Sequence, residues 1–429
     1  MFDLGLKLEA RCHINENGEG DRFVGIKADS DNAMVYFPMG YQLPENEEEI
    51  RQDILQLIAV LSEFSEMKDR VLHMSAFAAP QTVNFPIDSY MSIIRYYLDH
   101  GYYMETERVT KRGDRGHIDF KASLRHVSFF QEDGSPFFDA YEVRGTKPNE
   151  KNLITQINKY CVYVSFKQLG WLFTKECPPD PHIEANHEKF LMVLRSKLAS
   201  EHVETTKMLF KAMIALIDHL DKQTKENQFY FGTDRFEYVW ERLIDSVFGI
   251  KGKEEYFPRT HWILSYGDQK DNHALEPDSI MLHDGKIYVL DAKYYRYGIT
   301  GMPKHLPEST SINKQITYGE YIHEHDKFRQ QYGDDVPVFN AFLMPYNRMK
   351  NKFGVGGVFE SIGEATSDWK HDEHPYQRVQ GIVIDTRFLL YNYYGSHTSK
   401  ILQLATTIDE SLRTNGGALP ADSPQAMNA

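Results

Sequence analysis

Hydrophobic residues recur with the period of an α-helix in several stretches of the chain. Residues 46–64 begin with the acidic run Glu47-Glu48-Glu49, which suits the positive end of a helix, and their apolar positions lie on one face. The same spacing predicts further helices over residues 86–101, 151–175 and 233–249, and from about residue 311. Two more apolar stripes lie between residues 190 and 220, and their methionines are typical of a hydrophobic core rather than a cofactor site.

Shorter apolar runs bounded by glycine, proline and polar residues predict β-strands. They read RFVGIKA and AMVYFPMGYQLP within the first 45 residues, SPFFDAYEVRGTKP near residue 140, and VPVFNAFLMPY and VQGIVIDTRFLLYNY in the last third. Helices and strands therefore alternate in the C-terminal half, which favours an α/β core with a mixed central sheet flanked by helices, preceded by an N-terminal α+β domain.

Composition shifts suggest where these domains begin and end. The proline-rich segment 178–181 is the clearest break in the chain. We expect a partner- or DNA-contacting domain over residues 1–180, a helical connector over 181–225 and a catalytic domain over 226–413. Residues 414–429 are rich in glycine, proline and alanine, so we expect a disordered tail there.

The most informative stretch is EPDSIMLHDGKIYVLDAKYY, residues 276–295. Asp284-Gly285 between two apolar alternating runs is a strong signal for a two-residue hairpin turn. Counting outward from that turn brings Asp278 opposite Asp291, with Cβ atoms roughly 5 Å apart. Two like charges there repel unless a cation lies between them. Lys293 follows Asp291 by two positions, so it points to the same face of the strand.

Two carboxylates and one lysine at a strand end are the groups that metal-assisted phosphodiester hydrolysis needs. Carboxylate oxygens suit Mg²⁺, which polarises a phosphoryl oxygen and activates water, while the lysine stabilises developing charge. An ordinary surface hairpin with two solvated acids is the alternative, because Asp-x-Lys alone is a weak signal. It also occurs at Asp119-x-Lys121 and Asp284-x-Lys286.

In this combination of Pro-Asp, hairpin, apolar strand and Asp-x-Lys, the chain resembles the PD-(D/E)xK nuclease superfamily. More narrowly, it is similar to LlaJI-type restriction endonucleases and McrC nuclease subunits. The resemblance implies a restriction-endonuclease-like core in which Asp278 and Asp291 hold Mg²⁺, with Mn²⁺ able to substitute. It also implies the backbone carbonyl of Ala292 as a third oxygen ligand and Lys293 as the catalytic lysine.

Such nucleases carry an acidic residue on the helix before the hairpin, and two candidates stand here. Glu237 and Glu241 lie four residues apart on the same flank of the predicted helix 233–249. We favour Glu237 as a metal ligand, because it follows Phe236 in a Phe-Glu pair like that of McrC-type sequences. A solvated helix flank is the alternative for either. Gln315 resembles the glutamine that follows the lysine in these nucleases and is expected to support catalysis, whereas Tyr318 is expected to pack.

Other acids, bases and histidines give weaker signals. Asp119 and Lys121 with Asp139 and Glu142 form a second possible metal set, which we rank low because no tight hairpin joins them. Residues 111–175 are the most basic region and are interpreted as a DNA-backbone or partner-docking surface, or else as solvated loops. The histidines show no spacing typical of a metal cluster, and the pair His323-x-His325 is expected at the surface. The histidines considered are His13, His117, His323 and His325.

Composition limits the class of function. A net charge of −14 argues against a protein that coats DNA nonspecifically, and suggests that tight DNA binding depends on a partner. No run approaches the roughly 20 apolar residues of a membrane span. Three cysteines without zinc spacing fit a reducing cytoplasm. No phosphate-binding loop with Gly-Lys-Ser/Thr is present, so nucleotide hydrolysis would belong to another chain.

The residues at the hairpin end predict a Mg²⁺-dependent nuclease, and the resemblance implies a DNA endonuclease of a bacterial restriction, or phage-defence, system. The resemblance implies double-stranded DNA as the substrate and a separate McrB-like AAA+ GTPase as the partner, with a dimer of nuclease domains possible. Two alternatives stay open: an adaptor that stimulates the GTPase and has little or no nuclease activity, and a stand-alone type II restriction enzyme.

Overall fold

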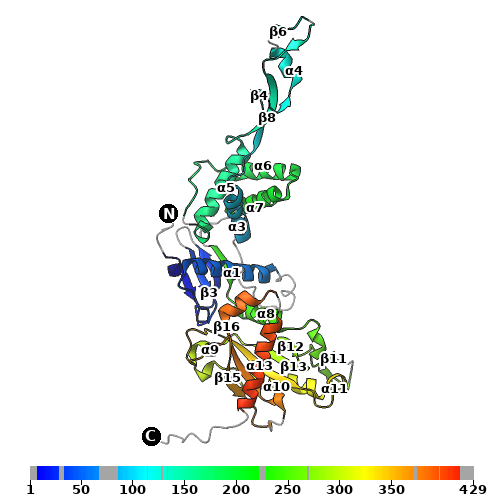
Figure 1. Ribbon diagram of the computed structural model, residues 1–429. Coiled ribbons are helices and arrows are strands. Elements are labelled where there is room, and N and C mark those ends of the chain that lie inside the picture. The colour runs from blue at the N-terminus through cyan, green and yellow to red at the C-terminus, as the bar shows by residue number, and fades with distance from the viewer. Residues whose placement is uncertain are drawn as a thin grey trace. The chain divides into compact units, whose positions relative to one another are not determined.

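The computed structural model describes residues 7–28, 33–66, 86–113, 115–126, 129–132, 134–174, 176–221, 229–267, 270–370, 374–395 and 397–415. They form two compact units, one within residues 84–228 and the other joining residues 6–83 to residues 229–429 (Figure 1). The chain passes between the units near residues 84 and 229, and the expected domain division stays a prediction. The expected tail lies outside the described residues, except that Thr414 and Asn415 end the last helix.

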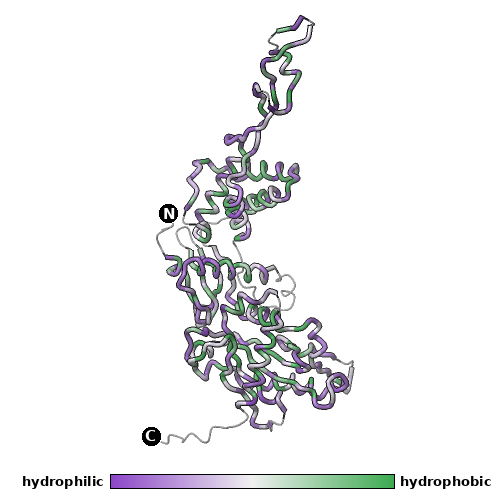
Figure 2. Tube along the Cα trace, in the orientation of Figure 1, coloured by the Kyte–Doolittle hydropathy of each residue, from purple (hydrophilic) through white to green (hydrophobic). Residues whose placement is uncertain are grey.

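The smaller unit is built on four packed helices, α3 (Ile87–His100), α5 (Leu153–Leu169), α6 (His187–Ser200) and α7 (Glu204–Asp221). A short 3₁₀ turn, η4 (Gly170–Leu172), follows α5. Asn152 and Asn186 cap α5 and α6 through side-chain oxygens that accept backbone N–H groups. The predicted helices of this region are confirmed, and their apolar stripes form the core. Figure 2 shows hydrophobic residues recurring among hydrophilic ones along these helices.

Two long strands of this unit form an arm, which we define as residues 106–148. β4 (Thr106–Gly113) pairs antiparallel with β8 (Tyr141–Pro148), and β5 (His117–Ile118) pairs with the other side of β8. Between them lie α4 (Phe120–Ser123), η3 (Leu124–His126), β6 (Phe129–Phe130) and β7 (Pro136–Phe137). Among the described residues of the arm, five large apolar side chains are exposed: Phe120, Leu124, Phe129, Phe130 and Phe137.

The larger unit begins with a four-stranded sheet of order β1-β3-β2-β9. After η1 (Leu8–Arg11) come β1 (Cys12–Ile14), β2 (Val24–Ala28) and β3 (Ala33–Phe37), while β9 (Phe229–Thr233) arrives from far along the chain. Gly25 of β2 lies opposite Gly232 of β9, and a Cβ on Gly25 would lie 2.1 Å from the Phe231 carbonyl oxygen. Only glycine permits this close approach of two backbones.

The second sheet of this unit has five strands in the order β12-β13-β14-β16-β15. Their bounds are β12 (Ser279–His283), β13 (Lys286–Ala292), β14 (Val338–Tyr346), β15 (Phe359–Ala365) and β16 (Val379–Asp385). The β13-β14 and β14-β16 pairs are parallel, and the two outer pairs are antiparallel. The expected α/β class with a mixed sheet is therefore confirmed.

Helices cover both faces of this sheet. On one face α10 (Ser309–Glu324) packs Tyr318 and Ile322 against Ile287 and Val289 of β13. Tyr288, which points the other way, donates its hydroxyl to Asp409 of α13 (Thr398–Asn415) at 3.1 Å. α8 (Phe236–Phe248) contacts α12 (Thr386–Asn392) and α13. Shorter elements are η5 (Lys253–Tyr256), β10 (His261–Trp262), β11 (Lys270–Asp271), α9 (Tyr297–Thr300), η6 (Pro303–His305), α11 (Asp326–Tyr332) and η7 (Pro375–Gln377).

One predicted strand is shorter than expected. The stretch 379–393 was expected to be extended throughout, but β16 ends at Asp385 and α12 follows at once. The Asp385 carboxylate accepts a hydrogen bond from the Phe388 backbone N–H at 2.7 Å and so caps that helix. An aspartate cap therefore overrides the extended preference of the aromatic and apolar residues that follow it.

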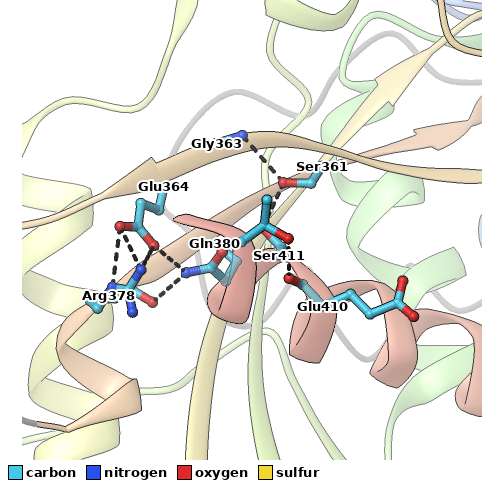
Figure 3. A network of polar contacts seen from close by, with 8 residues as sticks. Ser361, Gly363, Glu364, Arg378, Gln380, Glu410 and Ser411 are labelled. Carbon is cyan, nitrogen blue, oxygen red and sulfur yellow. Dashed lines mark hydrogen bonds and ion pairs between the residues drawn. The ribbon is translucent and has the colours of Figure 1, made fainter. Parts of the chain in front are cut away.

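A polar network fixes β15 and β16 to α13 (Figure 3). Glu364 on β15 accepts a bidentate ion pair from Arg378, and Gln380 donates to the same carboxylate at 2.9 Å. Ser411 on α13 donates to Gln380 at 2.6 Å and shares a hydrogen bond with Ser361. These partly buried groups satisfy one another, and they hold the outer strand where its register shifts between Ser361 and Gly363.

The N-terminal residues are bound to the five-stranded half of the unit by a buried ion pair. α1 (Glu47–Glu66) carries Asp53, which has no exposed surface and accepts two hydrogen bonds at 2.9 Å from Arg387 of α12. The Tyr391 hydroxyl also donates to Asp53. In the parts of the chain that the structure describes, no helix has the length and hydrophobicity needed to cross a membrane.

Candidate active site

The candidate site lies at the end of the hairpin formed by β12 and β13. His283 pairs with Lys286, Leu282 with Ile287 and Ile280 with Val289, as the sequence predicts. The two turn residues have positive φ angles, 49° for Asp284 and 71° for Gly285, which a type I′ turn requires. The hairpin and its register are therefore confirmed.

This register brings Asp278 and Asp291 together at the open end of the hairpin. The Asp278 Oδ2 accepts the Ala292 backbone N–H at 2.8 Å, so its carboxyl group is fixed against the strand that carries Asp291. Lys293 Nζ lies 2.7 Å from Asp291 Oδ2. The three side chains singled out in the sequence thus converge on one point, where Asp291 is only 9% exposed.

Burial and the closeness of these charged groups shift the pKa values of Asp278 and Lys293. Burial, together with the hydrogen bond and the charge of Asp291, raises the pKa of Asp278 from 3.8 to about 8. Burial acts to lower the pKa of Lys293, but the adjacent Asp291 carboxylate outweighs it and raises that pKa. The Asp278 pKa therefore stays raised although the Lys293 ammonium lies next to Asp291.

The helix before the hairpin contributes a third carboxylate, and it is Glu241 that senses the aspartates. Burial, followed by the charge of Asp291, raises the pKa of Glu241 to about 6. Glu237, favoured from the sequence, forms an ion pair of 3.1 Å with Arg235, which lies two residues earlier. Both acids lie on α8, and the charge coupling distinguishes them where spacing alone could not. Glu237 as the helix acid stays a prediction.

Neighbouring side chains hold the strand ends that carry the aspartates. Lys253 donates to the backbone carbonyl of Asp278 and forms a 2.8 Å ion pair with Asp245. The Tyr318 hydroxyl donates to the Glu276 carbonyl at 3.0 Å, two residues before Asp278. Sequence reasoning missed Lys253, and no motif marks it. Tyr318 is buried in the core cluster, which confirms the expectation that it packs.

Gln315 is placed to brace the strand rather than exposed to solvent. Its side chain has no exposed surface, and its Nε2 donates to the Val289 carbonyl of β13 at 2.7 Å. The predicted support of catalysis by Gln315 is not tested by this contact. Any such support would act through the position of β13, two residues before Asp291.

The donor set at the hairpin end fits a hard divalent cation. Asp278, Asp291 and Glu241 supply carboxylate oxygens. Burial first and the Asp291 charge second raise the pKa values of Asp278 and Glu241, and a bound cation would favour their ionised forms. Oxygen-only ligands of this kind match Mg²⁺ and Mn²⁺ rather than the nitrogen- and sulfur-binding metals.

The second possible metal set does not assemble. Asp119 caps α4 by accepting the Ala122 N–H, and it forms a 2.8 Å ion pair with Arg144. The hydrogen bond from Arg144 lowers the pKa of Asp119. Asp139 pairs with Arg112 at 3.2 Å. These acids are neutralised by separate arginines, as in a solvated arm.

One histidine lies where the sequence did not place it. His323 was expected at the surface but is 5% exposed, because it faces the loop before β14; its neighbour His325 is exposed as expected. His323 also lies close to Asp335 and His374, a grouping that sequence spacing does not reveal. Among the described residues, the three free cysteines form no disulfide.

Two of three comparisons with known proteins found a match. A family model described as LlaJI restriction endonuclease matches residues 23–363. Among solved structures, the chain is similar to a half-complex from a tetradecameric assembly of Thermococcus gammatolerans McrB AAA+ hexamers with bound McrC. The two share 12% identity with a TM-score of 0.33, over 90% of this chain and 83% of that chain. No curated protein matches.

Proposed function

The chain belongs to the LlaJI restriction endonuclease family, and we propose that it is a Mg²⁺-dependent DNA endonuclease with a PD-(D/E)xK core. The observation that carries the proposal is the meeting of Asp278, Asp291 and Lys293 at one end of the hairpin. The family and the chemistry of these three side chains point to the same reaction, hydrolysis of a phosphodiester bond.

In this proposal Asp278, Asp291 and the backbone carbonyl of Ala292 hold the cation, with an acid of α8 beside them. The charge coupling favours Glu241 for that acid over Glu237. The cation would stabilise negative charge developing on the phosphoryl oxygens. Without a cation, the carboxylates of this site would repel the DNA backbone.

The remaining groups position Asp278 and stabilise negative charge on the phosphate. The Lys293 ammonium, kept charged by Asp291, is suited to orient water and to stabilise the charge that develops on the phosphate. The Ala292 N–H fixes one oxygen of Asp278 and so sets the direction of the carboxylate. Lys253 holds the backbone of the same residue, which keeps the aspartate at the strand end.

We further propose that an McrB-like AAA+ GTPase is the partner, on the resemblance of the sequence to McrC subunits. Two features of this chain support a partner protein. The net charge of −14 disfavours independent DNA binding. The arm exposes aromatic side chains, of which Phe120 is 62% and Phe130 68% exposed, and such patches mark protein contacts.

Plasmid cleavage with purified protein tests both parts. The reaction is run with Mg²⁺ or with a chelator, and with or without the GTPase subunit and GTP. Cleavage that needs Mg²⁺ supports the nuclease assignment, and cleavage that also needs the GTPase supports the partner. Metal-dependent cleavage by the chain alone would reject the obligatory partner. Stimulated GTP hydrolysis without any cleavage would instead identify an adaptor.

A further inference from the structure

A second group of metal-binding side chains lies in the larger unit. His323 is on α10, Asp335 is in the loop before β14, and His374 directly precedes η7. Each offers one ligand atom, and these atoms all lie within 4.8 Å of one another. We propose that these three residues bind a divalent transition-metal ion, for which Zn²⁺ is the best match.

A hydrogen bond to the backbone orients the ring of His323. Its Nδ1 lies 3.1 Å from the backbone carbonyl oxygen of Val336. A carbonyl can only accept, so Nδ1 carries a hydrogen. Nε2, which lies 4.0 Å from a Glu324 carboxylate oxygen, is then the nitrogen left to bind a metal ion. Protein histidines that bind metals commonly donate their other ring N–H to such an acceptor, which fixes the tautomer and the direction of the ring.

The three ligand types select a different metal from the hairpin site. Two imidazoles and one carboxylate suit Zn²⁺, Co²⁺ or Ni²⁺, whereas Mg²⁺ prefers oxygen. Zinc bonds of about 2.0–2.1 Å place tetrahedral ligand atoms roughly 3.3 Å apart. Asp335 is exposed, so its side chain can turn inward by the small amount needed to close the site. Three protein ligands leave the fourth position for water or another small ligand.

This site is separate from the carboxylate site. Val338, the first residue of β14, pairs with Ile287 of β13, and Asp335 lies beyond that end of the strand. Asp291 lies four residues along β13 in the other direction, about 13 Å from Ile287. The two groups therefore occupy opposite ends of the sheet, and the proposal stands independently of the nuclease assignment.

The metal would clip together three segments that already pack closely. A Cβ on Gly319 of α10 would lie 2.5 Å from the Tyr376 Cβ, so helix and η7 are in direct contact. The Asn340 side chain of β14 donates to the Tyr376 carbonyl at 2.6 Å. Fixing the C-terminal end of α10 would also steady Gln315, whose side chain braces β13. The metal ion would therefore have a structural role and raise the thermal stability of the protein.

Zinc content and thermal stability of the full chain test the proposal. Protein is dialysed against a chelator and then given ZnCl₂ in excess Mg²⁺, which keeps the carboxylate site occupied by the harder ion. We expect one zinc per chain and a Tm rise of about 5–10 °C at a zinc concentration 100-fold above Kd. His323→Ala and Asp335→Ala should bind zinc at least tenfold more weakly, so at the same zinc concentration their Tm rise should be at most about half that of wild-type protein.

A matched control lies two residues from His323. The exposed His325 accepts the Lys327 backbone N–H at the start of α11, and asparagine can make the same cap. His325→Asn therefore removes a neighbouring imidazole without touching the cluster, and it should keep wild-type zinc binding. Asp335→Ala keeps the test decisive if His323→Ala fails to fold, because Asp335 is exposed.

The visible absorption spectrum of bound Co²⁺ tests the ligand set independently. Bound in this site, it should show the visible absorption of low-coordinate cobalt in wild-type protein and in His325→Asn, and lose it in Asp335→Ala. Failure of wild-type protein to retain zinc, or retention at wild-type affinity by Asp335→Ala, would overturn the proposal. His323 and His374 would then be members of an aromatic cluster with Tyr376, with ring centroids 4.6 and 5.3 Å apart.

Discussion

Replacing Asp278 by asparagine should make the metal-free protein more stable while abolishing DNA cleavage. The carboxyl group of Asp278 is buried beside Asp291, and its ionisation is opposed by both burial and charge. Asparagine has nearly the same shape, can still accept the Ala292 N–H, and carries no charge. The substitution therefore removes the repulsion without opening a cavity.

The magnitude follows from the pKa of Asp278 in the folded protein. The difference between a pKa of 3.8 and one of about 8 corresponds to at most about 6 kcal/mol by which ionised Asp278 destabilises the folded protein. Relaxation of the side chains and the ammonium of Lys293 reduce it, and we expect the free energy of unfolding to rise by about 2 kcal/mol above pH 8. For a unit of this size that equals a Tm increase of about 4–8 °C.

The pH dependence gives the sign of the effect. Between pH 4 and pH 8 the folded wild-type protein holds a proton on Asp278 that the unfolded chain releases, so wild-type stability falls as pH rises through this range. The variant lacks this group. Its advantage should be small near pH 4 and reach a plateau above pH 8.

Thermal unfolding in a chelator, at a series of pH values, measures this difference. Added Mg²⁺ should raise the Tm of wild-type protein and leave the variant unchanged, because binding to the folded state alone stabilises it. A variant that is less stable than wild type at pH 8 in chelator would refute the reasoning. It would mean that Lys293 already compensates both carboxylates.

Three further predictions follow from other contacts. Glu241→Gln should lower the cleavage rate at least about 100-fold, whereas Glu237→Gln should change it less than about fivefold, as initial rates in Mg²⁺ would show; the reverse order would restore Glu237 as the helix acid. Arg387→Ala leaves Asp53 buried without its ion pair and should lower the free energy of unfolding, measured by urea titration, by about 3 kcal/mol. A change below about 0.5 kcal/mol would contradict the stabilising role of this ion pair between α1 and α12. Tyr318→Phe should reduce kcat severalfold with unchanged DNA affinity, since it loosens the strand before the aspartates; an unchanged kcat would make that hydroxyl purely structural.

The hairpin could be predicted because all of its determinants are local. Asp284-Gly285 specifies the turn, the alternation of apolar residues specifies the faces, and together they fix the register that joins Asp278 to Asp291. Helices with apolar stripes, such as α8 and α10, could be predicted for the same reason.

Features that depend on distant residues could not be predicted. β9 pairs with β2 across some 200 residues of sequence, so the sheet in the N-terminal part of the chain is completed by a strand that no local pattern assigns to it. Glu237 and Glu241 share a helix flank, and only the folded position of Asp291 separates them. The approach of His323 to His374 likewise depends on how α10 packs, and spacing carries no trace of it.

The central claim is that the end of the hairpin is a metal-dependent nuclease site. Plasmid cleavage by wild-type protein, Asp291→Ala and Lys293→Ala, each assayed in Mg²⁺ and in chelator with the GTPase subunit and GTP present, tests it most directly. We predict that wild-type protein cleaves the plasmid in Mg²⁺ but not in chelator. In Mg²⁺ the cleavage rate of both variants should be at least about 100-fold lower. Wild-type rates of cleavage in either variant would contradict the account.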